Sequence, residues 1–234
     1  MNSNKNNNTP KEEITFLTGP QNLFNDIIFS VKVFFETLSG VIKLRNIGPC
    51  VTIFGSARFN EHHKYYKLGE AVGAAVAKLG VTVLTGGGPG VMEASNKGAK
   101  SVGGRSVGAN IVLPREQYPN IYLDTWIDLK YFFVRKVLLL KYSYAFVVLP
   151  GGVGTLDELF ESVTLIQTKK IEQFPIVLIG TEFFKPLMDL MHHLATEGTI
   201  AEEDIKMFYL TDDIDDAMQY IKKNALDRFN LQPE

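Results

Sequence analysis

The sequence predicts a Rossmann-like α/β fold, a doubly wound parallel sheet with an N-terminal helical extension. Three observations support this fold class. Short apolar runs recur along the chain, each is followed by a segment of helical periodicity, and no repeat or linker divides residues 48–226. Strands that are apolar along their whole length are buried on both faces, which is typical of a parallel sheet covered by helices.

Composition narrows the class of protein and its partners. The chain has 234 residues, 45% of them hydrophobic, and a formal net charge of −2, so it lacks the basic excess of proteins that bind nucleic acid or anionic membranes. Cys50 stands alone and opens an apolar strand, which predicts core packing and a reducing, cytoplasmic location. The pairs His62–His63 and His192–His193 fall in expected helices without a third ligand at metal spacing, so we expect no metal.

The first 47 residues are expected to lie outside the main domain. Residues 1–19 are polar and rich in Asn, which predicts a disordered tail with no recognisable signal peptide. Residues 20–47 are expected to form the helical extension, with one amphipathic helix over 20–44. Its apolar run contains Asp26 and Glu36, among other charges, and is therefore not expected to span a membrane.

The main domain is expected over residues 48–226, with a short tail at 227–234. Strands are predicted at 50–56, 81–88, 106–114, 145–152, 174–180 and 206–211, and 121–129 is either a strand or an extended loop. Helices are predicted at 65–80, 89–103, 129–143, 154–171, 182–198 and 212–224, with Pro89 in the first turn of its helix. In such sheets, ligands bind at the carboxyl ends of the strands, where the strand order reverses.

Two glycine-rich turns join a strand to the start of a helix. They are Gly86–Gly90, which includes Gly87 and Gly88, and Gly151–Thr155. Unpaired N–H groups and the helix dipole make such a helix start a site for anions, and Thr155 adds a hydroxyl donor. One such turn could be only a tight connection. Two of them in one domain favour a phosphate site.

The glycine spacing restricts which phosphate ligand is expected. The P-loop pattern GxxxxGK[ST] is absent, and the dinucleotide pattern GxGxxG fails because Val91 and Asp157 occupy its third glycine positions. The strand that ends at Leu113–Pro114 offers no acid for a ribose at its tip. A mononucleotide or a sugar phosphate therefore fits better than a dinucleotide.

Acidic residues follow the second glycine turn. Glu158 comes three residues after Thr155, so it faces the same side of the helix about one turn further on. A carboxylate there could reach past a phosphate held at the helix start. The alternative is that Asp157, Glu158 and Glu161 only complement the helix dipole.

Two cations interrupt the apolar helix that precedes this turn. Arg135 and Lys136 are costly in a mostly buried helix unless they are paired or point into a site. A structural salt bridge and a functional role are both open at this point. Arg58 and Glu93 are expected at the same sheet edge, with a weaker indication of a site role.

Four segments together are specific to one family. GGGPGVMEA, LPRE, VRK and PGGVGTLDE resemble the LONELY GUY family, the cytokinin-activating nucleoside 5′-monophosphate phosphoribohydrolases that are often labelled "lysine decarboxylase". The resemblance covers about residues 48–226. It implies a Rossmann-like fold, a homodimer or higher homo-oligomer, and hydrolysis of the N-glycosidic bond of a purine ribonucleotide to free base and ribose 5-phosphate, without a cofactor.

The resemblance also implies roles for individual residues. Arg135 and Glu158 would be catalytic. The nucleotide contacts would be Glu116, Lys136, Gly152, Val153, Gly154, Thr155, Leu156, Asp157 and Thr164, beside Gly87 and Gly88 of the first turn. GTLDE in place of GTLEE, GSAR in place of GSS, and the N-terminal extension depart from the plant members and leave the preferred base open.

Other functions remain possible at this stage. A lysine decarboxylase would need a Schiff-base Lys and pyridoxal phosphate in a much larger fold, and we reject it. A non-catalytic nucleotide or molybdenum-cofactor carrier is an alternative, because related Rossmann proteins bind that cofactor; an intact Arg135 and Glu158 argue against it. A nucleotide sensor that assembles through the N-terminal helix is another.

Overall fold

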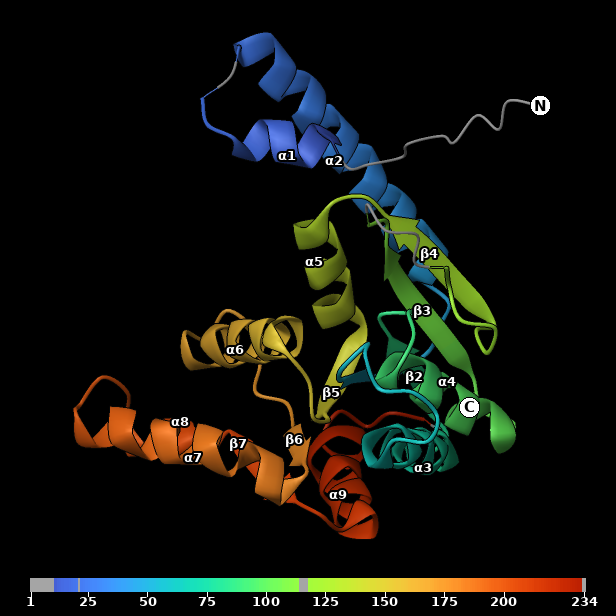
Figure 1. Cartoon of the computed structure of the whole chain (residues 1–234), viewed down its shortest axis with the longest axis vertical. Helices are drawn as coiled ribbons and strands as arrows, with labels where there is room; N and C mark the ends of the chain where they lie inside the picture. The colour runs from blue at the N-terminus through green and yellow to red at the C-terminus, as the bar shows by residue number, and fades with distance from the viewer. Residues whose placement is uncertain (1–10, 21, 114–117, 233–234) are drawn as a thin grey trace.

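The computed structural model describes residues 11–20, 22–113 and 118–232. Within these ranges the strands form one seven-stranded sheet in the order β4-β3-β2-β1-β5-β6-β7, and every neighbouring pair is parallel (Figure 1). The strands are β1 (Cys50–Phe54), β2 (Thr82–Thr85), β3 (Ser106–Ile111), β4 (Thr125–Leu129), β5 (Ser143–Val148), β6 (Ile176–Ile179) and β7 (Phe208–Thr211). The predicted doubly wound parallel sheet is confirmed.

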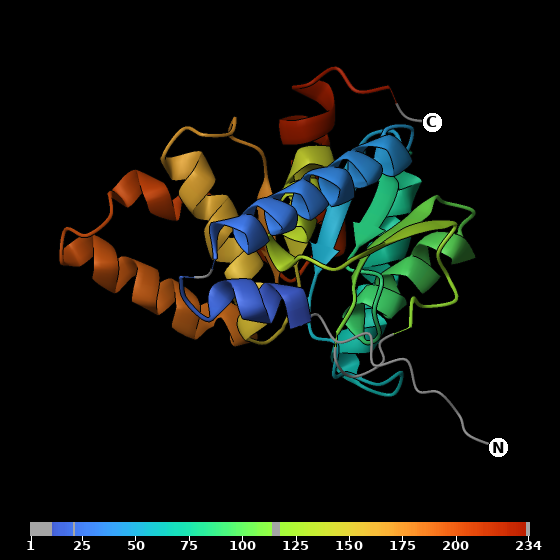
Figure 2. The ribbon, with the colours of Figure 1, turned by 90° about the horizontal axis from the view of Figure 1, so that it is seen from above.

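Helices cover both faces of the sheet. They are α1 (Lys11–Leu17), α2 (Leu23–Leu44), α3 (Lys64–Lys78), α4 (Val91–Ser101), α5 (Phe132–Tyr142), α6 (Val153–Gln167), α7 (Thr181–Thr196), α8 (Glu202–Ile205), α9 (Ile214–Ile221) and the π-helical segment η1 (Lys222–Asp227). Helices α3, α4 and α9 pack on one face, whereas α2, α5, α6 and α7 pack on the other (Figures 1 and 2). None of the described helices is long and apolar enough to cross a membrane.

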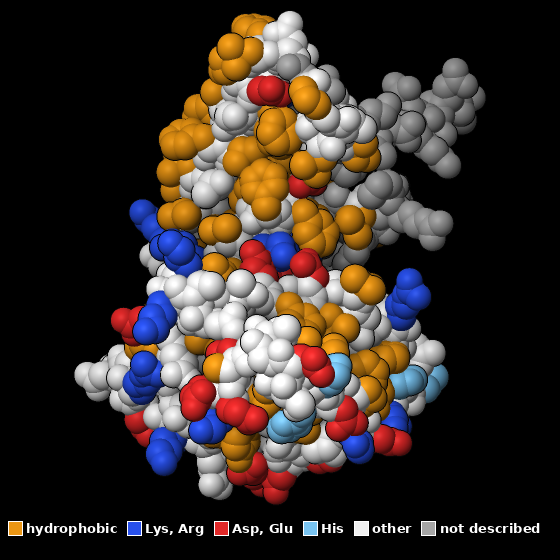
Figure 3. All heavy atoms as spheres, turned by 90° about the vertical axis from the view of Figure 1, so that its left-hand side faces the viewer, with side chains coloured by type: hydrophobic (Ala, Val, Ile, Leu, Met, Phe, Trp, Pro, Cys, Tyr) orange, Lys and Arg blue, Asp and Glu red, His pale blue; other side chains and the backbone are white. Residues whose placement is uncertain are grey.

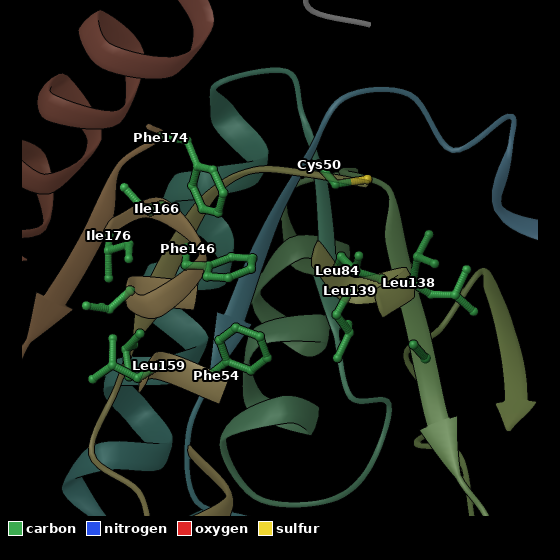
Figure 4. Packing of buried hydrophobic residues seen from close by; sticks show 14 of the residues in the cluster. Cys50, Phe54, Leu84, Leu138, Leu139, Phe146, Leu159, Ile166, Phe174 and Ile176 are labelled. Carbon is green, nitrogen blue, oxygen red and sulfur yellow. The ribbon is translucent and has the colours of Figure 1, made fainter. Parts of the chain in front are cut away.

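Aromatic side chains fill the core between the sheet and helices α5 and α6 (Figure 4). The ring of Phe146 on β5 meets Phe54 and Phe174 edge to face, at centroid distances of 5.0 and 4.9 Å. Such pairs add a small attraction to the burial of the rings themselves. Cys50 is fully buried in the same cluster, as the sequence predicted.

The N-terminal extension is more ordered than expected. Residues 11–17 form α1, inside the stretch predicted to be disordered, because Phe16 stacks on Phe29 of α2 with ring centroids 4.0 Å apart. Residues 1–10 lie outside the described residues. The predicted helix 20–44 is found as Leu23–Leu44, and its inner side packs on α5, where Gly40 leaves room for the side chain of Leu138.

Three further expectations need adjustment. The ambiguous stretch 121–129 contains the strand β4, because it pairs with β3 along five residues. Pro89 precedes its helix, which begins at Val91 after Gly90 (φ +70°). His63 is the N-cap of α3, and its Nδ1 accepts a hydrogen bond from the Tyr65 N–H.

Candidate active site

A cleft lies where the strand order reverses. The chain winds from β1 through β2 and β3 to β4 on one side and returns on the other side of β1 as β5. The loops that follow β1 and β5 meet there, since the Ser56 N–H donates to the Pro150 carbonyl at 3.1 Å. A cleft of about 550 Å³ opens at this edge. This is the position at which ligands bind in open parallel sheets.

Five regions of the chain contribute to the lining of the cleft. They are the segment after β1, the first glycine turn with α4, the end of β3, α5 and the start of α6. The lining residues are Phe54, Gly55, Ser56, Ala57, Arg58, Gly86, Met92, Ile111, Leu113, Phe132, Arg135, Gly152, Val153, Gly154, Thr155 and Glu158. The set combines glycines and polar side chains with apolar side chains such as Met92, Ile111 and Leu113.

The second glycine turn leaves its backbone open toward the cleft. A Cβ atom built at Gly152 or Gly154 would meet no atom within 4 Å, and Gly152 has a φ of −93°, which any residue can adopt. Gly151 differs, because its Cβ would collide with Thr155. Neither packing nor backbone conformation therefore explains glycine at 152. The close approach of a ligand to the first N–H groups of α6 would explain it.

Buried hydrogen bonds hold the first glycine turn in place. The Gly87 N–H donates to Thr85 Oγ1 at 3.0 Å, and Gly87 has a φ of +72°, which favours glycine. Asn120 Nδ2 donates to the carbonyls of Gly87 and Gly88 at 3.1 and 3.2 Å. Gly86 lines the cleft, whereas Gly87 and Gly88 shape the turn behind it. Their contact with a substrate remains a prediction.

Arg135 enters the cleft from α5. Its Nε donates to the Ala109 carbonyl at 2.9 Å, which fixes the guanidinium beside β3. The guanidinium packs so closely over Gly86 that a Cβ there would collide with it. Burial lowers the pKa of Arg135, and the nearby Glu158 carboxylate opposes that shift. An arginine nevertheless stays protonated in proteins, so the cleft holds a positioned positive charge.

Glu158 faces the cleft one turn into α6. Its side chain is buried, and its Oε1 atom has no hydrogen-bond partner among the described residues. Burial raises the pKa of this carboxyl to about 7, although Arg135 and Lys136 act to lower it. An unpartnered buried carboxylate costs free energy, and a perturbed acid in a cleft is typical of functional sites.

Lys136 lies beside the cleft rather than in its lining. Its Nζ atom is 3.0 Å from Asp157 Oδ2 and 2.7 Å from Glu161 Oε2. This is the structural salt bridge that the sequence left open. It joins α5, which carries Arg135, to α6, which carries Glu158. Substrate contacts of Lys136 and Asp157 remain predictions.

Three other residues predicted to contact the nucleotide do not line the cleft or lie outside the described residues. Thr164 is exposed, and its Oγ1 donates to the Phe160 carbonyl at 2.7 Å. The side chain of Leu156 packs against the hydrophobic core. Glu116 belongs to residues 114–117, which lie outside the described residues. Roles of these residues in binding remain predictions.

The N-terminal extension holds the start of the helix that carries Arg135. Glu36 Oε1 accepts hydrogen bonds from the N–H groups of Lys130 and Tyr131 at 3.0 and 2.9 Å. Glu13 Oε1 accepts from the Phe132 N–H at 3.1 Å. Burial raises the pKa of Glu36, and the two backbone donors oppose the shift. These carboxylates take the place of a local N-cap side chain.

Sequence reasoning missed part of the lining. Ser56 and Ala57 follow β1, and Ile111 and Leu113 lie at or beyond the end of β3, so the strand ends could have indicated them. Arg58 also lines the cleft. Its companion Glu93 lies outside the lining, and Glu93 Oε1 accepts a hydrogen bond from the Tyr66 hydroxyl at 2.8 Å.

The chain is similar in sequence to known proteins. A family model described as "possible lysine decarboxylase" matches residues 92–221. A cytokinin riboside 5′-monophosphate phosphoribohydrolase of Rhodococcoides fascians is 31% identical, over 74% of this chain and 88% of the relative. The enzyme of that name from Mycobacterium tuberculosis is 32% identical, over 68% and 86%. The chain belongs to the LONELY GUY family.

Solved structures confirm the fold of this LONELY GUY family member. The molybdenum cofactor binding protein of Rippkaea orientalis superposes with a TM-score of 0.57 at 21% identity, over 75% of this chain and 96% of that one. The molybdenum cofactor carrier protein of Chlamydomonas reinhardtii gives 0.53 at 23% identity, over 76% and 98%. At this level of identity the likeness concerns the fold alone.

Proposed function

We propose that the chain is a nucleoside 5′-monophosphate phosphoribohydrolase that releases a free purine base and ribose 5-phosphate, with AMP or a cytokinin-type nucleotide as substrate. The observation that carries the proposal is Glu158, a buried carboxylate whose Oε1 atom has no hydrogen-bond partner in the described part of the chain, beside an open glycine turn at a helix start. The phosphoribohydrolases among its relatives support the reaction type.

The proposed substrate would bind by its phosphate. The first N–H groups of α6, at Val153 and Gly154, have no partner inside the helix, and the helix dipole favours an anion there. The Thr155 side chain lines the same end of the cleft. With the phosphate at the start of α6, the ribose would lie over Glu158 and the base would contact apolar lining residues such as Met92 and Ile111.

Glu158 would act on the ribose. Cleavage of the bond between C1′ and the base nitrogen passes through a state with positive charge on the sugar, which a carboxylate stabilises. The ionised Glu158 would also take a proton from the attacking water. The water oxygen would then bond to C1′ as the bond to the base breaks, and the proton taken up by Glu158 would pass to the departing base nitrogen, which returns Glu158 to its ionised form. This role needs the ionised carboxyl, so the pKa of about 7 leaves Glu158 poised near neutral pH.

Arg135 would supply the positive charge of the site. Its guanidinium is fixed by the Ala109 carbonyl and lies over Gly86, between the two glycine turns. There it would contact the phosphate or the negative charge that builds on the departing base. A partly buried, pre-positioned cation needs little reorganisation during the reaction.

Two alternatives fare less well. Among the lining residues that the structure describes there is no lysine to form a Schiff base, which disfavours decarboxylation. A nucleotide or molybdenum-cofactor carrier would use the same fold, as the solved neighbours do, but needs no buried unpaired carboxylate. We further propose that the protein acts in the cytoplasm as a homo-oligomer, as the family resemblance implies.

The proposal is tested with the full chain and a set of nucleotides. AMP, other monophosphates and adenosine are incubated with the protein, and free base and ribose 5-phosphate are measured by chromatography. We expect base from a monophosphate but little from adenosine, and loss of turnover with retained nucleotide binding in Glu158→Gln. The exposed Glu197→Gln serves as the matched control. Tight nucleotide binding without base release from any monophosphate would support the carrier instead.

A further inference from the structure

Helix α2 has apolar side chains on two opposite sides. Its inner side carries Phe29 and Leu44, which are buried against the rest of the molecule. Its outer face, which we define as Phe24, Ile28, Val31, Phe35, Leu38 and Ile42, is exposed. An apolar side of a helix is normally buried against another element. The outer face therefore lacks a partner within the described part of the chain.

The outer face has the spacing of a helix-pairing seam. Its six residues follow one another at intervals of four, three, four, three and four, which is the heptad pattern of coiled coils. Ile27 and Phe34 flank the seam, and no charged side chain interrupts it. Knobs-into-holes packing against a second helix requires this arrangement.

The exposed apolar area is large enough for a stable interface. These eight side chains are 39% to 68% exposed, and Figure 3 shows hydrophobic side chains gathered over the upper part of the molecule, which α1 and α2 form. The largest apolar patch on a typical monomer is about 300–600 Å². A standard interface takes about 800 Å² from each partner, and the seam with its flanks provides a comparable surface.

Charge and composition favour a second copy of the chain as the occupant. Helices that lie on anionic membranes carry a cationic polar side, whereas the two lysines of α2, Lys32 and Lys43, are balanced by Asp26 and Glu36. Interfaces with transient partners are about as polar as the remaining surface, whereas homodimer interfaces are more apolar. A wholly apolar seam is also complementary to itself, as a twofold interface must be.

We propose that the outer face of α2 is the interface through which two copies of this chain associate. This inference goes beyond the hydrolase function and specifies the surface for the homo-oligomer proposed above. No seam residue lines the cleft, so self-association and hydrolysis are measured by separate readouts on the same variants. The interface belongs to the N-terminal extension, outside the sheet and its cleft.

The test compares two single-charge variants of the full chain. Phe35→Glu places a carboxylate in the seam of both copies, and Asn25→Glu adds the same charge on the polar side of α2. By sedimentation velocity across a concentration series, we expect a dimer for the wild type and Asn25→Glu. We expect Phe35→Glu to raise the dimer dissociation constant by about 100-fold or more, because a buried charge would replace an aromatic contact. Leu38→Glu repeats the test at a second seam position.

Three outcomes would overturn the proposal. The first is a wild type that stays monomeric at all concentrations. The second is a dimer that survives both Phe35→Glu and Leu38→Glu with unchanged circular dichroism, since another surface would then hold the copies. The third is a monomer that sediments with vesicles of phosphatidylcholine and phosphatidylglycerol and loses this binding in Phe35→Glu. Base release from AMP, measured on the same samples, reports separately on the hydrolase proposal.

Discussion

The cleft and the outer face of α2 break the usual rules of burial in opposite ways. The cleft buries Glu158 and partly buries Arg135, two groups that ordinarily face water, whereas α2 exposes six apolar side chains along one face. Each arrangement costs the isolated molecule free energy. A ligand would relieve the cost in the cleft, and a second copy would relieve it on α2. The two regions therefore indicate what kind of partner each is built for.

The two regions are also physically connected. Glu36 of α2 accepts hydrogen bonds from the backbone N–H groups of Lys130 and Tyr131, which directly precede α5. Helix α5 in turn carries Arg135 into the cleft. The extension is thus part of the support for the site. The predictions below, together with the two tests above, separate effects on the cleft from effects on α2.

The largest effect is expected from Arg135→Gln. Loss of the positioned charge should lower kcat/KM for the nucleotide substrate by about 100-fold or more, the range seen when one electrostatic group of a site is removed. The unfolding temperature should hardly fall, because the variant also removes a partly desolvated charge. Steady-state kinetics and thermal unfolding on the same preparation check this. A fall in kcat/KM that is accompanied by a large fall in unfolding temperature would indicate that Arg135 has a structural role.

The next effect concerns the open glycine turn. Gly154→Ala should keep or raise the free energy of unfolding by about 0.5–1 kcal/mol, because alanine is the better helix former and its Cβ meets no atom within 4 Å. Gly152→Val should likewise fold. Both should weaken nucleotide binding, by about tenfold or more for Gly152→Val if the backbone approaches a phosphate. Gly151→Ala, which collides with Thr155, should instead lower stability. Unchanged nucleotide binding in both Gly152→Val and Gly154→Ala would show that the phosphate does not bind at this turn.

The third prediction concerns pH. Because Glu158 must be ionised to act and its pKa is raised to about 7, kcat/KM should fall roughly tenfold for each pH unit below that value. A ¹³C carboxyl titration, assigned by its loss in Glu158→Gln, should show the same pKa. A carboxyl that titrates near 4.5 would contradict the proposed environment.

Stability should change with pH in the opposite direction. A carboxyl whose pKa is raised by folding stabilises the folded state while it is protonated, so its contribution is full below about pH 4.5 and is lost as the pH rises through about 7. Glu158→Gln should therefore unfold at a similar temperature to the wild type at pH 4.5. At pH 8 it should unfold at a higher temperature. The exposed Glu197→Gln variant should unfold at about the same temperature as the wild type at both pH values.

The smallest effect is expected from Glu36→Ala. Two backbone N–H groups lose their acceptor, which should cost about 1–2 kcal/mol of unfolding free energy and lower kcat several-fold through a less rigid start of α5. Glu36→Gln keeps an acceptor oxygen and should restore most of both. Kinetics and urea unfolding check this. An Ala variant with full activity would show that Glu36 does not support the cleft.

The sequence by itself determined the fold class and the core of the candidate site. Apolar runs alternating with helical segments require a parallel sheet, because only burial on both faces suits such strands. Two glycine turns at helix starts, with Glu158 about one turn after Thr155, indicated a candidate anion site with an acid beside it, and the family resemblance then implied a catalytic role for Glu158. These features depend on residues that are close in sequence.

The tertiary structure decided everything that joins distant segments. Whether Lys136 enters the cleft or pairs with Asp157 and Glu161 depends on how α5 and α6 pack, and the structure shows the ion pairs. The pKa of Glu158 follows from burial, which no spacing reveals. The order of α1 follows from Phe16 stacking on Phe29 in the next helix. Desolvation and packing arise only when the chain is assembled, so they remained beyond the reach of sequence patterns.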